Sequence, residues 1–393
     1  MVPGRTRSRR LIAAALVALG AVVVTSCTQL QVDETVISSD TFQGRDNATA
    51  GSILAQRYLI DRLATMAVGI NPSKTGDASF QQPFDGGTNL LAEIPGTDKA
   101  GEYVMIGAHY DHLGTNCRTA DPNDHICNGA TDNGAGVGAV LQIAKMIKDH
   151  GAPRRTVVLA LWDREEDGLL GSKYYTEHPI VPLAQTVAYI NFDIQGANLL
   201  PSLQNASFAV GAETGGPQLQ SLVRSAVATG PLQTRLVSSI FGQNRSDYIN
   251  FTNVGVPNVF FSDSTGPCYH TAQDQVGVVD FWKLDQQAKL TYQLARSLIQ
   301  ADGRPPFTTG TPLATFDDAL SLQAVTSSAI ADLGRFTAEQ QSQLLKFRDD
   351  LNAIVAGGPA AFDSADISTL VSGAATAVSI LTSGTCGGFL SHH

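Results

Sequence analysis

Short apolar runs of strand length alternate along this chain with segments of helical periodicity, and this alternation constrains the fold more than any other feature. The run 156–162 is apolar almost throughout, which is typical of a strand buried on both faces of a sheet. Strand-like runs also occur at 89–94, 103–109, 187–192 and 256–261, and helical spacing occurs at 52–67, 133–149, 169–177, 217–228 and 281–300. The alternation predicts an α/β domain with a largely parallel sheet.

Residues of the kind that bind metals stand where several of these runs stop and a turn begins. They are His109, Asp132, Glu165, Glu166, Asp193 and His270. In open α/β sheets this edge is where sites are built. Two imidazoles with carboxylates form a mixed nitrogen and oxygen donor set, which suits zinc, and one bridging Asp can hold two ions. A Glu beside a ligand Glu is what metal-assisted hydrolysis needs as a general base.

Each motif alone also has a plain structural explanation. A single His at a strand end is more often a satisfied turn residue than a ligand, and Asp132 before a helix is a natural N-cap. Glu165 and Glu166 fit a solvated turn, although adjacent carboxylates repel each other unless a cation is present. Asp193 is harder to explain in this way, because an acid that ends an apolar strand needs a partner. Asp111 and Asp274 are candidates for acids that support the ligands from behind.

The N-terminus has the pattern of an export signal. Basic residues at 5–10 precede an apolar stretch at 11–24 that is short for a membrane span, and small residues then lead to Cys27. This resembles a bacterial lipoprotein signal, in which Cys27 becomes the lipid-modified first residue. An ordinary secretory signal is the alternative. We therefore expect an exported protein, either anchored on the outer side of the cytoplasmic membrane by lipid alone or secreted.

Composition divides the rest of the chain. We expect a signal peptide at 1–26, a polar tether at 27–50, a catalytic domain at 51–302 and an all-helical C-terminal extension at 303–393, with helices near 315–330, 337–355 and 364–381. The extension carries none of the ligand candidates. The sequence leaves open whether it packs on the domain, makes oligomer contacts or covers the site.

Charge and cysteine content limit the partners and the compartment. Loss of the four arginines in the signal leaves 22 basic against 36 acidic residues, and such an acidic surface argues against nucleic acid. Four cysteines remain, and an even count outside the cytoplasm suggests disulfides. Cys117 and Cys127 flank one polar loop, which would leave Cys268 to pair with Cys386. Free buried thiols are the alternative.

Taken in order, the motifs resemble those of the secreted di-zinc aminopeptidases, the bacterial leucyl and Streptomyces type of zinc exopeptidase. The matching segments are H-Y-D at 109–111, D-N-G at 132–134, E-E-x-G-L-x-G-S at 165–172, N-F-D at 191–193 and C-Y-H-T at 268–271. The resemblance covers about residues 85–300. It implies a three-layer αβα fold with a mixed, largely parallel sheet, two Zn²⁺ per chain and peptide substrates with a free N-terminus.

The resemblance also implies a role for each matching residue. His109 and Asp193 would bind one zinc, Glu166 and His270 the other, and Asp132 would bridge both. Glu165 would be the general base. Tyr269 would help to hold the scissile carbonyl oxygen, and Arg245 would contact substrate.

The chain departs from the family pattern at a few positions. Arg164 stands beside the glutamate pair where a small residue is usual, and a side chain of this size would alter the pocket. Tyr248 replaces a more frequent His. Gln243 stands where some members carry the carbonyl-binding tyrosine, so that role would fall to Tyr269.

Three other functions fit parts of the pattern. The same scaffold supports carboxypeptidase action and single-zinc glutaminyl cyclisation, and a surface lipoprotein can keep a peptidase fold only for binding. The complete set of ligand candidates favours two metals and hydrolysis. The sequence does not specify the preferred N-terminal residue or the oligomeric state.

Overall fold

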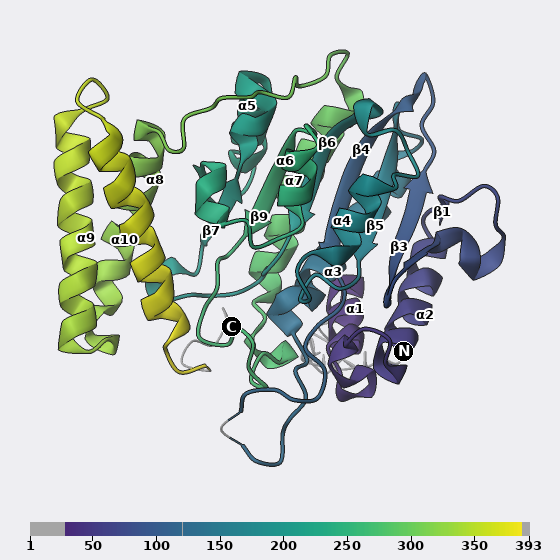
Figure 1. Ribbon diagram of the computed structural model, residues 1–393, viewed down its shortest axis with the longest axis horizontal. Coiled ribbons are helices and arrows are strands. Elements are labelled where there is room, and N and C mark those ends of the chain that lie inside the picture. Colours follow the sequence, from purple (N-terminus) through teal and green to yellow (C-terminus); the bar gives the residue numbers. More distant parts are fainter. Residues whose placement is uncertain (1–27, 120, 387–393) are drawn as a thin grey trace, which may run out of the picture.

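A computed structural model describes residues 28–119 and 121–386 of the chain (Figure 1). The expected signal peptide and Cys27 lie outside these residues. The described strands form one mixed sheet in the order β1-β3-β5-β4-β6-β9-β7-β8, with β2 paired to β3. The strands are β1 (Val68–Gly69), β2 (Gln81–Phe84), β3 (Gly87–Ile94), β4 (Lys99–His109), β5 (Arg155–Trp162), β6 (Thr186–Phe192), β7 (Ala206–Val210), β8 (Gln233–Val237) and β9 (Asn258–Ser262).

The four central strands, β5, β4, β6 and β9, run parallel, whereas β3 and β7 join them antiparallel. Helices cover both faces of this sheet. They are α1 (Gln29–Ile37), α2 (Ala50–Ala64), α3 (Ala135–His150), α4 (Leu170–Glu177), α5 (Gly216–Val227), α6 (Tyr248–Asn253) and α7 (Phe281–Gln300). The predicted three-layer α/β fold with a mixed sheet is therefore confirmed.

Strand β5 shows why the run 157–162 is apolar. Successive side chains of a strand point to opposite faces. Val157, Leu159 and Leu161 pack in the larger core with α3 and α7, whereas Val158 and Trp162 pack in a second core with residues of α4 and α6. All residues of β5 are buried, so neither face of the strand tolerates regular polar positions.

The segment expected to be a polar tether, 27–50, is folded where it is described. Helix α1 begins after Thr28, whose side chain caps it, and packs against α3 through Leu30. Its acidic residues Asp33 and Glu34 are buried. Asp33 pairs with Arg62 of α2 at 2.7 Å, so the polarity that suggests a tether serves internal contacts. Residues 29–50 thus pack as part of the folded body and do not form a tether.

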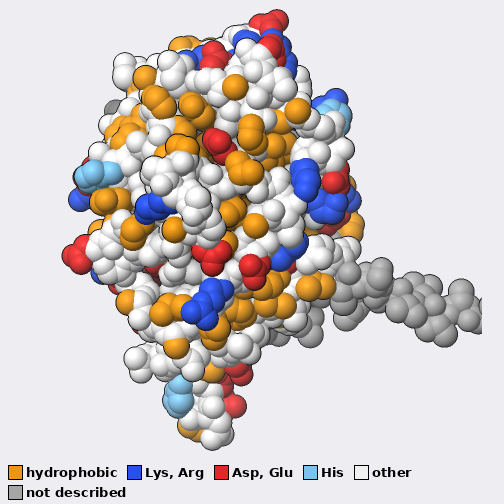
Figure 2. Space-filling model, turned by 90° about the vertical axis from the view of Figure 1, so that its right-hand side faces the viewer, with side chains coloured by type: hydrophobic (Ala, Val, Ile, Leu, Met, Phe, Trp, Pro, Cys, Tyr) orange, Lys and Arg blue, Asp and Glu red, His pale blue; other side chains and the backbone are white. Residues whose placement is uncertain are grey.

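The flank that carries α1, α2 and β1 keeps some apolar side chains at the surface. Val32, Ile53, Leu54 and Val68 are the large apolar residues exposed there. Figure 2 faces this side and shows apolar side chains lying among charged and polar ones. Scattered exposed apolar residues of this kind are normal for a soluble surface.

The C-terminal extension is helical as expected and lies on the opposite flank, beyond β7 and β8 (Figure 1). Its helices are α8 (Phe316–Ala329), α9 (Ala338–Gly357) and α10 (Ser364–Thr382). They enclose a small core of their own around Leu322, Phe347, Leu351 and Leu370. Asp318 fixes the extension to the body by accepting hydrogen bonds from the backbone and hydroxyl of Ser238, at 2.6 and 2.7 Å.

Helix α10 is long and apolar enough to cross a membrane by length and composition alone. Its exposed positions, however, include the small polar residues Ser368, Ser372 and Ser379, together with Ala365 and Ala375. Its inner face packs through Leu370 and Ile380. This division is that of an amphipathic helix on a protein body.

Candidate metal centre

The fold brings all six ligand candidates to one edge of the sheet. His109 is the last residue of β4, Asp193 follows β6, and the Glu165–Glu166 turn follows β5. These strands are parallel, so their carboxyl ends meet. Asp132 lies in a π-helical turn, Ala130–Gly134, directly before α3, and His270 lies in the loop after β9.

Asp132 occupies the centre of the group. Its Oδ1 lies 3.2 Å from Nε2 of His109, and its Oδ2 lies 3.2 Å from Nε2 of His270. Each imidazole also faces one further carboxylate: Asp193 Oδ1 lies 3.4 Å from His109, and Glu166 Oε2 lies 3.1 Å from His270. The arrangement is two His–carboxylate pairs that share one aspartate.

The donor set fits divalent zinc. Nitrogen and carboxylate oxygen are ordinary zinc ligands, and the ligand atoms of His109, Glu165 and Asp193 lie within 4.8 Å of one another, as do those of His112, Asp132 and Glu166. The nearest buried cation, Arg45, donates to backbone carbonyls of Tyr110, Asn128 and Gly129 and not to these acids. Carboxylates gathered in this way need a cation.

The two adjacent glutamates have opposite electrostatic environments. Burial raises the pKa of Glu165 well above its ordinary value, and the neighbouring acids Asp193 and Glu166 add to the effect. Burial would also raise the pKa of Glu166, but His112 and His270 lower it to about 2. Glu165 is therefore the better proton acceptor and Glu166 the better anionic ligand.

His112 is a site residue that the sequence analysis did not identify. Its Nδ1 lies 2.6 Å from Oε1 of Glu166, and its side chain is fully buried. Its Nε2 has no hydrogen-bond partner in the described part of the chain. The signal was the fourth residue of the run H-Y-D-H, three positions after the ligand candidate His109.

The two supporting acids hold backbone turns, and Asp111 Oδ1 also lies 3.6 Å from Nδ1 of His109. Asp111 accepts hydrogen bonds from the backbone N–H groups of Glu165 and Glu166, at 3.1 and 3.2 Å, and so fixes that turn. Asp274 accepts from Thr131 and from the N–H of Asp132, at 3.1 Å, and so fixes the central turn. Asp274 makes no described contact with His270, the residue beside which the sequence placed it.

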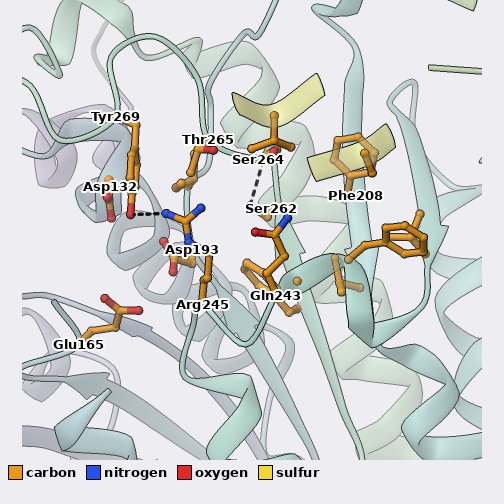
Figure 3. Close-up of a pocket in the computed structure, with 18 of the residues that line it drawn as sticks. Asp132, Glu165, Asp193, Phe208, Gln243, Arg245, Ser262, Ser264, Thr265 and Tyr269 are labelled. Atoms are coloured by element: carbon orange, nitrogen blue, oxygen red, sulfur yellow. Dashed lines mark hydrogen bonds between the residues drawn. The ribbon is translucent and has the colours of Figure 1, made fainter. Parts of the chain in front are cut away.

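Tyr269 and Arg245 stand together at the mouth of the site (Figure 3). The Nη2 of Arg245 donates to the Tyr269 hydroxyl at 3.1 Å, and the Tyr269 ring stacks on His270 with ring centres 3.7 Å apart. Burial raises the pKa of Tyr269, so its hydroxyl keeps its proton and remains a donor.

The expectation that Arg164 alters the pocket is wrong. Its guanidinium donates to the Asp167 carboxylate at 2.9 Å and to the Asp85 carbonyl at 2.7 Å, and it does not line the cavity. Tyr248 is likewise buried beside Ser239 and away from the cavity. Gln243 does line it.

A cavity of about 140 Å³ extends from the metal centre. The carboxylates of Asp132, Glu165 and Asp193 lie at one end, and Phe208 lies at the other, near the C-terminal helices drawn in yellow (Figure 3). Leu322 of α8 and Val378 of α10 are part of this lining. The extension thus packs on the domain and forms part of the cavity wall at the end away from the carboxylates.

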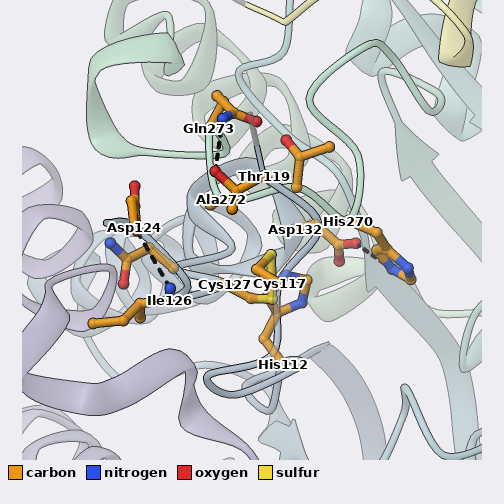
Figure 4. Close-up of a disulfide and its surroundings, with 12 residues drawn as sticks. His112, Cys117, Thr119, Asp124, Ile126, Cys127, Asp132, His270, Ala272 and Gln273 are labelled. Carbon is orange, nitrogen blue, oxygen red and sulfur yellow. Dashed lines mark hydrogen bonds and ion pairs between the residues drawn. A yellow bond between two sulfur atoms is a disulfide. The ribbon is translucent and has the colours of Figure 1, made fainter. Parts of the chain in front are cut away.

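Both expected disulfides are present. Cys117–Cys127 closes the polar loop beside His112 and packs on Ala272 (Figure 4). Cys268–Cys386 joins the His270 loop to the end of the C-terminal extension across 118 residues of sequence. The loop that carries His270 is therefore tied on two sides, because Arg118 also forms a β-bridge with Thr271.

Imidazoles and carboxylates paired at the carboxyl edge of an α/β sheet define a site that can hold divalent metal ions. Residues 89–295, more than half of the chain, match the model of Peptidase family M28, and the chain belongs to this family.

Known relatives agree with this assignment. Probable glutamate carboxypeptidase AMP1 of Arabidopsis thaliana is 29% identical over 207 residues, 47% of this chain and 26% of that protein. Leupeptin-inactivating enzyme 1 of Streptomyces exfoliatus is 30% identical over 173 residues, 44% of this chain and 34% of that protein. This chain therefore spans about a quarter to a third of these relatives. The LapA aminopeptidase structure of Legionella pneumophila shares the fold, with a TM-score of 0.57 and 18% identity over 70% of this chain and 71% of that one.

Proposed function

We propose that this protein is a zinc-dependent aminopeptidase that holds two Zn²⁺ ions and removes N-terminal residues from peptides. The observation that carries the proposal is Asp132, which directs one carboxylate oxygen to His109 and the other to His270. His109 and Asp193 would hold one ion, and Glu166 and His270 the other. Zinc bound there lowers the pKa of a coordinated water and polarises the substrate carbonyl.

The chain's own residues supply proton transfer and orientation. Glu165 accepts the proton of the attacking water and delivers it to the leaving amine, a role that its raised pKa favours. The Tyr269 hydroxyl donates to the carbonyl oxygen as negative charge develops there. The free α-amine of the substrate would sit near these acidic groups and one metal ion, and this placement would direct cleavage to the first peptide bond.

Carboxypeptidase action is the second candidate, because Arg245 is the one cationic side chain among the described residues that line the cavity. A guanidinium there suits a substrate carboxylate. The hydrogen bond that Arg245 already makes to Tyr269 favours the aminopeptidase function instead.

One experiment separates these functions. Purified protein is loaded with zinc, its metal content is measured, and it is assayed on matched peptides with a free N-terminus, a blocked N-terminus or a blocked C-terminus, with and without chelator. We expect two zinc ions per chain and chelator-sensitive release of the first residue only when the N-terminus is free. One ion per chain would indicate the cyclase chemistry, a requirement for a free C-terminus would indicate a carboxypeptidase, and no turnover would indicate a binding protein.

We further propose that the protein is exported and anchored through a lipid on Cys27. The basic and apolar pattern before Cys27 supports this proposal, and the two disulfides are typical of an oxidising compartment. A Cys27→Ser variant should leave the membrane fraction, whereas a Cys27→Ser protein that stays membrane-bound would disprove lipid anchoring.

A further inference from the structure

The cavity at the metal centre has an acidic end and an apolar end. Away from the carboxylates its walls are mostly apolar side chains from β7, β8 and β9, from the turn Ser239–Gly242 and from the C-terminal extension. They are Phe208, Val210, Val237, Phe241, Phe260, Leu322, Ala374 and Val378. No charged side chain other than the site acids and Arg245 lines it in the described part of the chain.

A second cavity, of about 110 Å³, lies directly beyond this apolar end. The two cavities share the lining residues Phe208, Ser264, Leu322, Ala374 and Val378. The rest of the second lining is almost wholly apolar and comes largely from α8, α9 and α10, with Leu199, Leu200 and Leu203 on the body side. The C-terminal extension therefore forms most of the second cavity, which adjoins the cavity at the metal centre.

The size and the lining of the second cavity determine which chemical groups can bind in it. An apolar cavity of on the order of 150 Å³ stays dry and binds a molecule such as benzene. A charged or strongly hydrated group would lose its water there without gaining a partner. An alkyl or aryl group gains from burial in proportion to the area removed from water.

We propose that the second cavity is the distal part of the pocket for the side chain of the substrate's N-terminal residue, so that the enzyme prefers long, unbranched apolar side chains at that position. The inference rests on the proposed aminopeptidase function. The α-amine and this side chain are bonded to the same carbon atom, which is also bonded to the scissile carbonyl carbon. A pocket that starts at the carboxylates therefore receives the side chain of the first residue.

The extension is held firmly enough to act as a pocket wall. Asp332 accepts a hydrogen bond from the N–H of Ser202 at 2.8 Å, and Thr265 and Thr382 hydrogen-bond at 3.1 Å. The Cys268–Cys386 disulfide ties its end to the loop of His270. The side chains that would contact the end of the substrate's first side chain therefore hold fixed positions relative to the metal centre.

The test is a homologous series of aminoacyl anilides in which the N-terminal residue is alanine, norleucine, 2-aminooctanoate or 2-aminodecanoate, with leucine for comparison. We expect kcat/KM to rise about fourfold per methylene, the rate equivalent of ~0.8 kcal/mol, and to keep rising past norleucine. A maximum at leucine or norleucine, followed by a fall, would overturn the proposal while leaving aminopeptidase activity intact. Failure to cleave any free N-terminal residue would instead reject the proposed function.

A pair of variants on α10 locates the effect. Ala377 lines the second cavity but not the first, whereas Ala375 is exposed on the same helix. Ala377→Phe should abolish the gain beyond norleucine and leave alanine cleavage within about twofold, and Ala375→Phe should change neither. Equal losses on all substrates in a folded Ala377→Phe protein would contradict the assignment, and the wild-type series tests it even if that variant does not fold.

Discussion

At the residue scale, the site depends on neighbouring side chains with different surroundings. Glu165 and Glu166 are chemically identical and adjacent, yet only Glu166 lies against two imidazoles, His112 and His270. Burial raises the pKa of Glu165; the nearby His109 opposes this rise, whereas Asp193 and the buried Asp247 add to it. When the surroundings of two titratable groups move their pKa values apart, the difference indicates which group acts as acid and which as base.

This difference predicts different failures for the two glutamates. Glu165→Gln should bind both zinc ions and melt at the wild-type temperature but lose turnover by on the order of 10² to 10⁴. Glu166→Ala should lose one zinc ion, because His270 would no longer have Glu166 as its fellow ligand. Metal analysis and steady-state kinetics check both variants. Near-normal kcat in a fully metallated Glu165→Gln protein would place the base elsewhere.

His112 should act through Glu166. Its Nδ1 contact at 2.6 Å orients the carboxylate toward His270, and removal of such a supporting partner typically lowers metal affinity by about 10- to 100-fold. We expect this loss in His112→Ala, measured by competition with a zinc chelator, with His125→Ala, at an exposed position, as the control. Unchanged zinc affinity in His112→Ala would show that Glu166 needs no such support.

At the element scale, helix α1 places an acidic side chain, Glu34, in the interior of the protein. Glu34 accepts a hydrogen bond from Ser38 at 2.8 Å, while its second oxygen lies buried against α3 without a described partner. Burial raises the pKa of Glu34 to about 8 despite that hydrogen bond and the nearby charge of Arg45. The folded protein therefore holds a proton that the unfolded chain releases at lower pH.

The sign of the resulting pH dependence follows from this raised pKa. The favourable contribution of protonated Glu34 is complete below about pH 4.5 and is lost as pH rises toward 8, at up to ~1.4 kcal/mol per pH unit. Glu34→Gln removes this titration. The melting temperature of the wild type should therefore fall relative to Glu34→Gln between pH 5 and 8, and parallel curves would show that Glu34 is ionised in the folded state.

The same scale shows what the sequence alone could predict. The predicted strand at 156–162 corresponds to β5, and the predicted helix at 281–300 matches α7 in full, because both have strong and uniform hydrophobic patterns. Strands β7 and β8 were missed, since each has five residues and includes polar positions, such as Thr234 and Arg235. Their strand character comes from pairing with each other and with β9, which no local pattern records.

Some residues of the candidate site could likewise be predicted from the sequence, and others could not. Acids and imidazoles at the ends of apolar runs are visible in sequence, because parallel strands place those ends together. His112 is not distinguishable in this way, since its role arises only from its contact with Glu166. The apolar lining from Leu322 and Val378 was equally hidden, because more than 150 residues separate these helices from the glutamate pair in the chain.

At the scale of the whole molecule, the C-terminal extension packs on the sheet and also borders the candidate site. It buries Phe347, Leu351 and Leu370 internally, and α8 packs along β8 at the end of the sheet. It also supplies part of the wall of the cavity that begins at the metal centre (Figure 3). None of the proposed zinc ligands belongs to the extension. We therefore expect that the extension can be removed without removing a metal ligand.

Ending the chain at residue 303 tests this separation. The truncated protein should be less soluble and melt at a lower temperature, because each large apolar side chain that loses its burial costs roughly 1.5–3 kcal/mol. The folded fraction should still bind zinc and cleave alanine substrates, but it should lose its advantage on long apolar side chains. Metal analysis, thermal melting and the homologous substrate series measure the three properties separately.

Cys386→Ala is the matched control, because it keeps every helix and removes only the bond to Cys268. A disulfide that closes a loop of about 100 residues stabilises by up to ~4.7 kcal/mol in the chain-entropy treatment. Cys386→Ala should therefore melt at a lower temperature and keep the preference for long side chains. A soluble truncated protein with an unchanged melting temperature would show that the extension contributes nothing to the fold. A stable, fully metallated truncated protein that cleaves no substrate would show that the extension is needed for catalysis itself.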